Sequence, residues 1–111
     1  KDELYKSLEL KGIHNVELIQ GNILETLPQY LEEHGELRIS LLHIDTDVYE
    51  PCKAGWELLF DRVVPSGIIV FDDYSVIEGE TKAVDEFFAN KKVVFHKFSF
   101  SHTKPTYMVK D

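Results

Sequence analysis

The chain has 111 residues, which is enough for one domain (residues 1–111) and too few for two. Its 20 acidic and 12 basic side chains give a net charge of −8, which argues against nucleic-acid and anionic-membrane partners because both attract a basic surface. The 43% of apolar residues indicate a folded core, and the single cysteine excludes an internal disulfide. We therefore expect a cytoplasmic single domain.

Strand-like and helix-like segments alternate along the chain, which is typical of an α/β fold. Leucines at helical spacing predict a first helix over Asp2–Lys11 and a second over Asn22–Gly35. Between the two helices, Val16–Gln20 is predicted to be a short strand that ends at Gly21.

The middle of the chain predicts two strands joined by a helix. Ile39–Ile44 is mostly apolar at successive positions, as expected for a strand that helices cover on both faces. Pro51 suits the first turn of a helix that runs to about Phe60. After a turn at Val64–Gly67, Ile68–Phe71 is the most hydrophobic strand of the sequence.

The last part predicts a helix over Gly79–Asn90, followed by an antiparallel hairpin of Val93–Phe100 and Thr106–Lys110. The predicted fold is therefore α/β, with a mixed, mainly parallel sheet that ends in a C-terminal antiparallel hairpin.

Two of the predicted strands end in acidic residues, Asp45 and Asp47 after the first and Asp72 and Asp73 after the second. If these strands are parallel neighbours, the four carboxylates gather at the sheet edge where α/β folds bind ligands. Such a group needs a proton or a cation, and its oxygen ligands suit Mg²⁺, Ca²⁺ or Mn²⁺. For each aspartate separately, the alternative is a turn or the cap of the following helix.

The segments around these acids resemble the macrocin O-methyltransferase family, whose S-adenosylmethionine-dependent enzymes methylate sugar hydroxyls on natural products. The resemblance rests on Leu42–Glu50, Val64–Tyr74 and Ala83–Phe87, which occur in the family's order. Upstream, Gly21–Pro28 is similar to the family's glycine followed by Thr-Leu-Pro.

The resemblance implies roles for the four aspartates. Asp45, Asp72 and Asp73 match the family positions that hold a divalent cation, usually magnesium. Asp47 matches the general base, which takes the proton of the substrate hydroxyl. The implied substrate is a sugar or another small molecule with a hydroxyl group.

The resemblance also implies a cofactor site, of which only part is matched. Gly21 and Asn22 match positions near the adenine of S-adenosylmethionine, but none of the six glycines forms the Gly-x-Gly turn that receives the cofactor. In the family's layout, the chain corresponds to a Rossmann-like class I methyltransferase fold that is truncated and lacks its first two strands. We therefore expect this fragment to be inactive by itself.

The missing strands have a structural consequence for Ile39–Ile44, which becomes an exposed apolar edge of the sheet. We expect either that Val16–Gln20 pairs with this edge or that two chains meet there in a homodimer.

Two other interpretations stay open at this point. Asp45–Val48 and the pair Asp72-Asp73 are similar to the nucleophile and metal motifs of haloacid-dehalogenase-type phosphatases. Only 27 positions (72 − 45) separate Asp45 from Asp72, which leaves little space for the Ser/Thr and Lys motifs of those phosphatases. The second alternative is a non-catalytic α/β fragment that dimerises.

Overall fold

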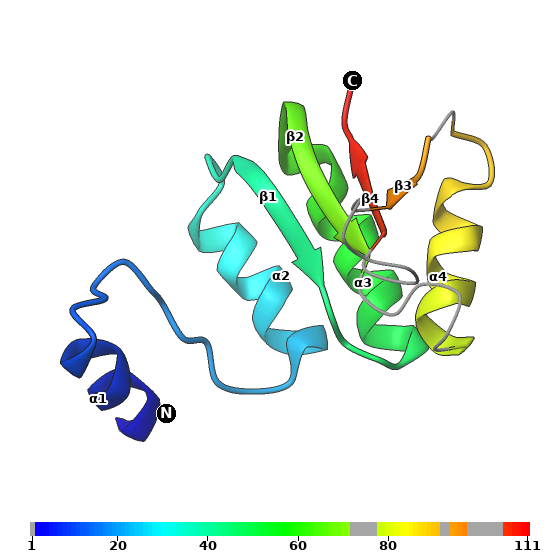
Figure 1. The fold of residues 1–111 in the computed structure, drawn as a ribbon. Coiled ribbons are helices and arrows are strands. Elements are labelled where there is room, and N and C mark those ends of the chain that lie inside the picture. The colour runs from blue at the N-terminus through cyan, green and yellow to red at the C-terminus, as the bar shows by residue number, and fades with distance from the viewer. Residues whose placement is uncertain (1, 72–77, 92–93, 98–105) are drawn as a thin grey trace.

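The computed structural model describes residues 2–71, 78–91, 94–97 and 106–111, and its elements are shown in Figure 1. Helices and strands alternate along the chain, which confirms the α/β class. The elements are α1 (Asp2–Leu10), α2 (Ile23–Glu33), β1 (Ile39–Ile44), α3 (Tyr49–Leu59), a 3₁₀ turn (Phe60–Arg62), β2 (Val63–Phe71), α4 (Glu78–Phe88), β3 (His96–Lys97) and β4 (Thr106–Val109).

The four described strands form one sheet in the order β1-β2-β4-β3. β1 and β2 are parallel neighbours joined by α3, as the sequence predicts, whereas β4 is antiparallel to both β2 and β3. The C-terminal hairpin is therefore confirmed. Only one of these three pairings is parallel, so the described sheet is mixed but not mainly parallel. Within the predicted strand Val93–Phe100, the structure describes a strand only at His96–Lys97.

The core lies between one face of the sheet and the helices α3 and α4. Successive side chains of a strand point to opposite faces, so Leu42 and Ile44 of β1 and Ile69 and Phe71 of β2 are buried against these helices. Trp56 of α3 lies at the centre of this layer and is 1% exposed. The core is completed by Cys52, Val63, Ala83, Val84, Phe88 and Met108.

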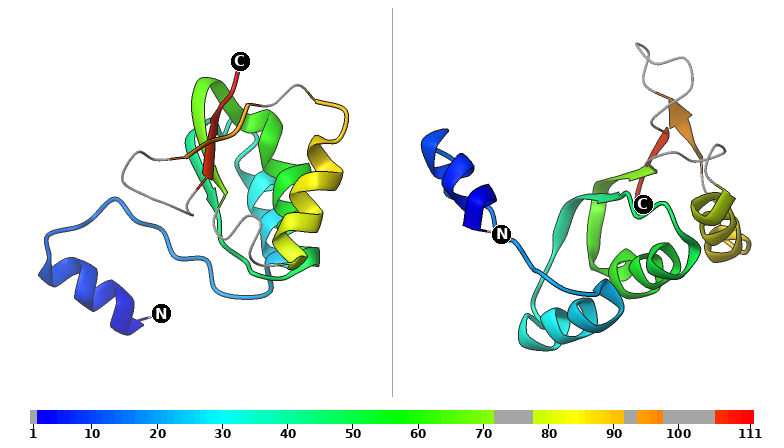
Figure 2. Two further views of the ribbon diagram at one scale, coloured as in Figure 1. Left: turned by 45° about the vertical axis from the view of Figure 1, so that its right-hand side comes forward. Right: turned by 90° about the horizontal axis from the view of Figure 1, so that it is seen from below.

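The opposite face of the sheet is exposed, and the expectation that helices cover Ile39–Ile44 on both faces is wrong for the described residues. Figure 2 shows α2, α3 and α4 on the same side of the sheet. On the other side, Leu41 of β1 and Ile68 of β2 are 61% and 39% exposed. Apolar side chains such as Leu41 and Ile68 are typical of a face that another element covers. The described helices cover only the opposite face of the sheet.

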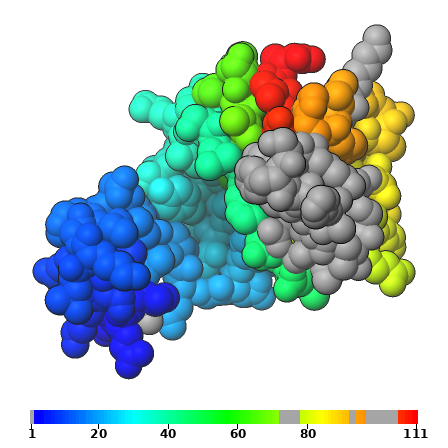
Figure 3. Space-filling model, in the orientation of Figure 1, coloured from blue at the N-terminus to red at the C-terminus, as the bar shows by residue number. Residues whose placement is uncertain are grey.

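The segment Val16–Gln20 is not a strand, and the expectation that it pairs with Ile39–Ile44 is wrong. It is irregular and leads away from the sheet to α1, which buries none of its residues. One contact between this segment and α1 is the hydrogen bond that the Leu18 N–H donates to the Tyr5 hydroxyl at 2.8 Å. In Figure 3 this N-terminal arm forms a lobe beside the body of the molecule. A strand needs a ladder partner, and five residues without one gain nothing from extended pairing. The homodimer stays a prediction.

The predicted turn at Val64–Gly67 lies inside β2 as a bulge. The parallel register pairs Ile39 with Val63 and then Leu41 with Ile68, so the intervening residues of β2 are an insertion in the ladder. Ser66 has a φ of 70° in this bulge, a left-handed conformation that is unfavourable for serine.

None of the described helices is both long and apolar enough to cross a lipid bilayer.

Candidate metal and active site

The parallel pairing of β1 and β2 brings the ends of both strands together, as the sequence predicts. Ile44 and Phe71, the last residues of the two strands, are partners in the register. Asp45 follows Ile44 directly, and Asp72 and Asp73 follow Phe71. The two latter residues lie outside the described part of the chain, so their side chains are not placed.

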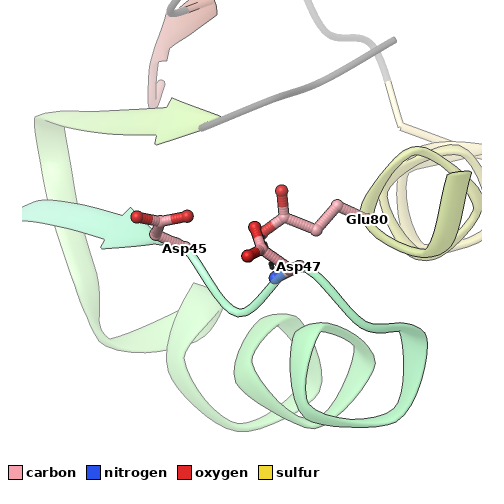
Figure 4. Close-up of side chains that lie close together, drawn as sticks. All are labelled: Asp45, Asp47 and Glu80. Atoms are coloured by element: carbon pink, nitrogen blue, oxygen red, sulfur yellow. Dashed lines mark hydrogen bonds between the residues drawn. The ribbon is translucent and has the colours of Figure 1, made fainter. Parts of the chain in front are cut away.

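Three carboxylates gather at this edge: Asp45, Asp47 and Glu80, which reaches in from the first turn of α4 (Figure 4). One oxygen of each lies within 4.8 Å of the others. Asp45 and Asp47 are exposed, whereas Glu80 is 1% exposed. An all-oxygen set at this spacing suits a hard divalent cation.

The two oxygens of Glu80 have different surroundings. Oε1 accepts hydrogen bonds from the backbone N–H groups of Thr46 at 2.9 Å and Asp47 at 3.1 Å. Oε2 is buried and has no hydrogen-bond partner among the described residues. Burial raises the pKa of the Glu80 carboxyl, the two N–H donors oppose this shift, and the charges of Asp47 and Asp45 add to it. A cation at this edge would offset the combined negative charge of the three carboxylates, so the donor set present fits such a site.

Sequence reasoning missed Glu80, although the sequence carries a signal for it. Glu80 precedes Ala83 and Val84 by three and four positions, and Phe88 follows one turn later, so it lies on the apolar stripe of α4. A carboxylate on a buried stripe costs stability unless it has a partner. That conflict between residue type and position marks a functional candidate.

The capping alternative for Asp45 and Asp47 does not hold. Helix α3 has Val48 as its N-cap residue, and no side-chain hydrogen bond caps it. Asp47 has a φ of 62°, in the left-handed region, and the Val48 N–H donates to the Thr46 carbonyl at 2.7 Å in the same turn. The turn after β1 is therefore tight, which agrees with the turn alternative for Asp47, whereas no aspartate side chain caps α3.

Gly21 and Asn22 lie at the start of α2. The Asn22 side chain caps this helix, since its Oδ1 accepts a hydrogen bond from the Leu24 N–H at 3.0 Å. Gly21 has a φ of 135°, which favours glycine. Figure 1 shows the N-terminal end of α2 on the side of the sheet where β1 ends. Both residues therefore have a structural role, and their contact with a cofactor stays a prediction.

Tyr49 ties α3 to α4 beside the acidic site. Its hydroxyl donates a hydrogen bond to the carboxylate of Glu86, and Lys82 Nζ lies 4.7 Å from the centre of its ring. The hydrogen bond to Glu86, followed by desolvation and nearby acidic charges, raises the pKa of Tyr49 from 10.0 to about 12.

Glu86→Gln is expected to lower the pKa of Tyr49 toward 10.0, because it removes both the charged acceptor and its negative charge. The ultraviolet absorbance of the phenolate, with Tyr49→Phe as the reference spectrum, measures this pKa. The folded pKa is the higher one, so this pair stabilises the fold below pH 10 and loses its contribution as the pH rises from 10 to 12. An equal Tyr49 pKa in both proteins would contradict the assignment.

Comparisons with known proteins give similar structures and a matching family. Part of two CalS11 structures is similar to the chain, one of them described as the apo form of a TDP-rhamnose 3′-O-methyltransferase in calicheamicin biosynthesis, with 29% identity and a TM-score of 0.74. The other, described as a calicheamicin methyltransferase, has 28% identity and a TM-score of 0.76. The matches cover 83% of this chain and 40% and 36% of the two CalS11 chains. This chain therefore spans less than half of the CalS11 chains.

A structure of the O-methyltransferase NovP shares the fold at 24% identity and a TM-score of 0.55, over 64% of this chain and 29% of that one. A comparison with curated protein sequences gives no match. Residues 2–99 match the macrocin-O-methyltransferase (TylF) family, which favours the methyltransferase interpretation over the phosphatase one. Because this match covers nearly the whole length of the chain, the chain belongs to the macrocin-O-methyltransferase family.

Proposed function

We propose that this chain forms the cation-binding and general-base part of an S-adenosylmethionine-dependent O-methyltransferase that acts on a sugar or other small-molecule hydroxyl. The observation that carries the proposal is the parallel pair β1 and β2, whose last residues Ile44 and Phe71 are register partners and directly precede Asp45 and Asp72 in the sequence. Family membership and the likeness to a TDP-rhamnose 3′-O-methyltransferase support the reaction and the sugar substrate.

The proposal gives each aspartate one task. Asp45, Asp72 and Asp73 hold a divalent cation, for which magnesium is the natural candidate because all donors are carboxylates. Asp47 is the general base. Its exposed carboxylate lies beside Asp45 and can accept a proton from a hydroxyl that binds at this edge.

Methyl transfer needs a deprotonated oxygen and an aligned methyl donor. When bound, the cation polarises the substrate hydroxyl and S-adenosylmethionine supplies the methyl group. Asp47 accepts the hydroxyl proton as the O–H bond breaks. With the cofactor bound, the oxygen would form its new bond to the methyl carbon, and sulfur would keep the electron pair of the broken S–C bond. The role of this chain is thus to orient the hydroxyl and take its proton.

The proposal places Gly21 and Asn22 near the adenine of the cofactor, at the end of the sheet that carries the acids. The rest of S-adenosylmethionine would bind to a glycine-rich turn. No Gly-x-Gly pattern for such a turn occurs in this sequence. We infer that turnover requires more protein than these 111 residues, in line with the fraction of CalS11 that they span.

Calorimetric titration of the chain with Mg²⁺ and with S-adenosylmethionine tests the proposal. We expect Mg²⁺ to bind, and Asp72→Asn to weaken binding by a factor of ten or more, roughly the effect of losing one charged ligand. Asp61→Asn removes the same charge from the exposed 3₁₀ turn and is the matched control.

The outcomes separate the parts of the proposal. Binding of S-adenosylmethionine at micromolar strength would show that the missing glycine turn is dispensable or is replaced by a second chain. Binding of Mg²⁺ without the cofactor identifies a metal-competent fragment of the enzyme. Binding of neither ligand would overturn the proposal for this chain and leave the non-catalytic interpretation.

A further inference from the structure

Glu80 makes contacts that packing alone does not require. Its side chain is 1% exposed, and Oε1 accepts two hydrogen bonds from consecutive backbone N–H groups, those of Thr46 and Asp47. The two donors belong to the turn after β1, 34 and 33 positions earlier in the sequence. Figure 4 shows the carboxylate of Glu80 reaching from α4 toward this turn.

The turn that receives Glu80 has an uncommon backbone conformation. Asp47 adopts a φ of 62° in the left-handed region, which is uncommon for a residue other than glycine, although aspartate tolerates it better than most. Both N–H groups on the Glu80 side of the turn point to one oxygen, which is a strong arrangement because the acceptor is a carboxylate. The same turn carries Asp47, whose carboxylate lies close to that of Asp45.

The start of α4 is pressed against this turn. Gly79 has no side chain, and a Cβ atom there would lie 2.8 Å from the Tyr49 backbone nitrogen and 3.2 Å from the Asp47 carbonyl oxygen. Two consecutive residues of α4 therefore contact this turn. Gly79 allows the backbone of α4 to approach it closely, and Glu80 accepts hydrogen bonds from its N–H groups.

We propose that Glu80 is a positioning residue, which fixes the turn at Thr46 and Asp47 through its two hydrogen bonds and so holds the Asp47 carboxylate toward Asp45. The inference rests on the proposed function in one respect, since Asp47 is the general base there. Glu80 itself touches neither substrate nor cation in this scheme. The role explains why a carboxylate occupies a position on the apolar stripe of α4, where an aliphatic side chain would pack without cost.

The test compares three substitutions of Glu80 in the 111-residue chain. Glu80→Gln keeps a carbonyl oxygen at Oε1 and can accept the same two hydrogen bonds. Glu80→Ala removes the acceptor. Glu80→Leu also removes it but fills the space on the apolar stripe, so it keeps the fold if Glu80→Ala does not. Glu78→Ala removes an exposed charge from the same turn of the helix and is the control.

The readouts are amide hydrogen exchange at Thr46 and Asp47 and the affinity for Mn²⁺. We expect Glu80→Ala and Glu80→Leu to speed exchange at both amides, each by about tenfold or more, because a hydrogen bond to a charged acceptor is lost. Both variants should also weaken Mn²⁺ binding, because the loosened turn begins at Asp45, which is a proposed cation ligand. Glu80→Gln should give smaller changes in both readouts than Glu80→Ala, because it keeps an acceptor for the two N–H groups but loses the charge. Glu78→Ala should leave exchange and affinity close to those of the original chain.

Two results would overturn the inference. Unchanged exchange at Thr46 and Asp47 in Glu80→Leu would show that the carboxylate does not hold the turn. A loss of Mn²⁺ affinity in Glu80→Gln equal to that in Glu80→Ala, with normal exchange, would make Glu80 a direct cation ligand instead. If the original chain binds no Mn²⁺, the cation-binding part of the proposed function fails, while the exchange measurement still decides the role of Glu80.

Discussion

Replacing Trp56 by alanine is expected to remove a large part of the free energy of unfolding of this chain. Trp56 is 1% exposed and fills the space between α3, α4 and the sheet. Its ring lies 5.0 Å from that of Phe71 and 5.5 Å from that of Phe88, centre to centre. Truncating a buried Trp to Ala costs about 3–5 kcal/mol, and a domain of this size has about 5–15 kcal/mol in total.

Urea denaturation followed by far-ultraviolet circular dichroism measures this loss without using the tryptophan as the probe. Trp56→Phe is the matched comparison, because it keeps an aromatic ring against Phe71 and Phe88. The buried Trp56 Nε1 has no hydrogen-bond acceptor among the described residues, so the phenylalanine variant gives up no hydrogen bond there. We expect it to lose less than half as much as the alanine variant. Equal losses would show that the indole is not packed as the structure has it.

The helices and the parallel strand pair could be predicted because local pattern alone determines them. Asn22 begins α2 with a side-chain cap, and the spacing of apolar residues along α3 and α4 follows the helical repeat. The strands Ile39–Ile44 and Ile68–Phe71 are short apolar runs between turn residues, and the helix between them makes a parallel crossover the natural connection.

The error at Val16–Gln20 has a different origin. Its apolar residues Val16, Leu18 and Ile19 are common in strands, yet a strand forms only where a ladder partner is available. Local sequence contains no information on whether β1 offers an edge to this segment. The uncovered face of β1 is a related case, since Leu41 is as apolar as a buried residue but is 61% exposed.

The part of the candidate site that lies directly after the strands could be predicted from the sequence. Asp45 follows β1 directly and lies where the sequence places it, with Asp47 nearby. Glu80 could not be paired with them from spacing, because its contact with Thr46 and Asp47 depends on how α4 packs against the turn after β1. The sequence does show a carboxylate on the apolar stripe of α4. This marks Glu80 as a candidate but does not reveal which groups it contacts.

Gly79→Ala is expected to destabilise the chain and loosen the acidic site together, although helix propensity alone predicts the opposite. Alanine is favoured over glycine inside a helix by about 1 kcal/mol. Here its Cβ would meet backbone atoms of Tyr49 and Asp47 at 2.8 and 3.2 Å, and backbone cannot rotate away as a flexible side chain can. Such overpacking typically costs about 1–3 kcal/mol, so the steric effect outweighs the propensity.

The same substitution at Gly35 provides the control, because a Cβ there has no atom within 4 Å and the residue follows α2 away from the site. Thermal and urea unfolding should show a loss for Gly79→Ala and little change or a small gain for Gly35→Ala. Hydrogen exchange at Thr46 and Asp47 should accelerate only in Gly79→Ala, since displacing α4 withdraws the Glu80 carboxylate from both amides. A Gly79→Ala protein that is as stable as the original and keeps both amides protected would show that α4 does not press on the turn, and the positioning of Asp47 would then need another cause.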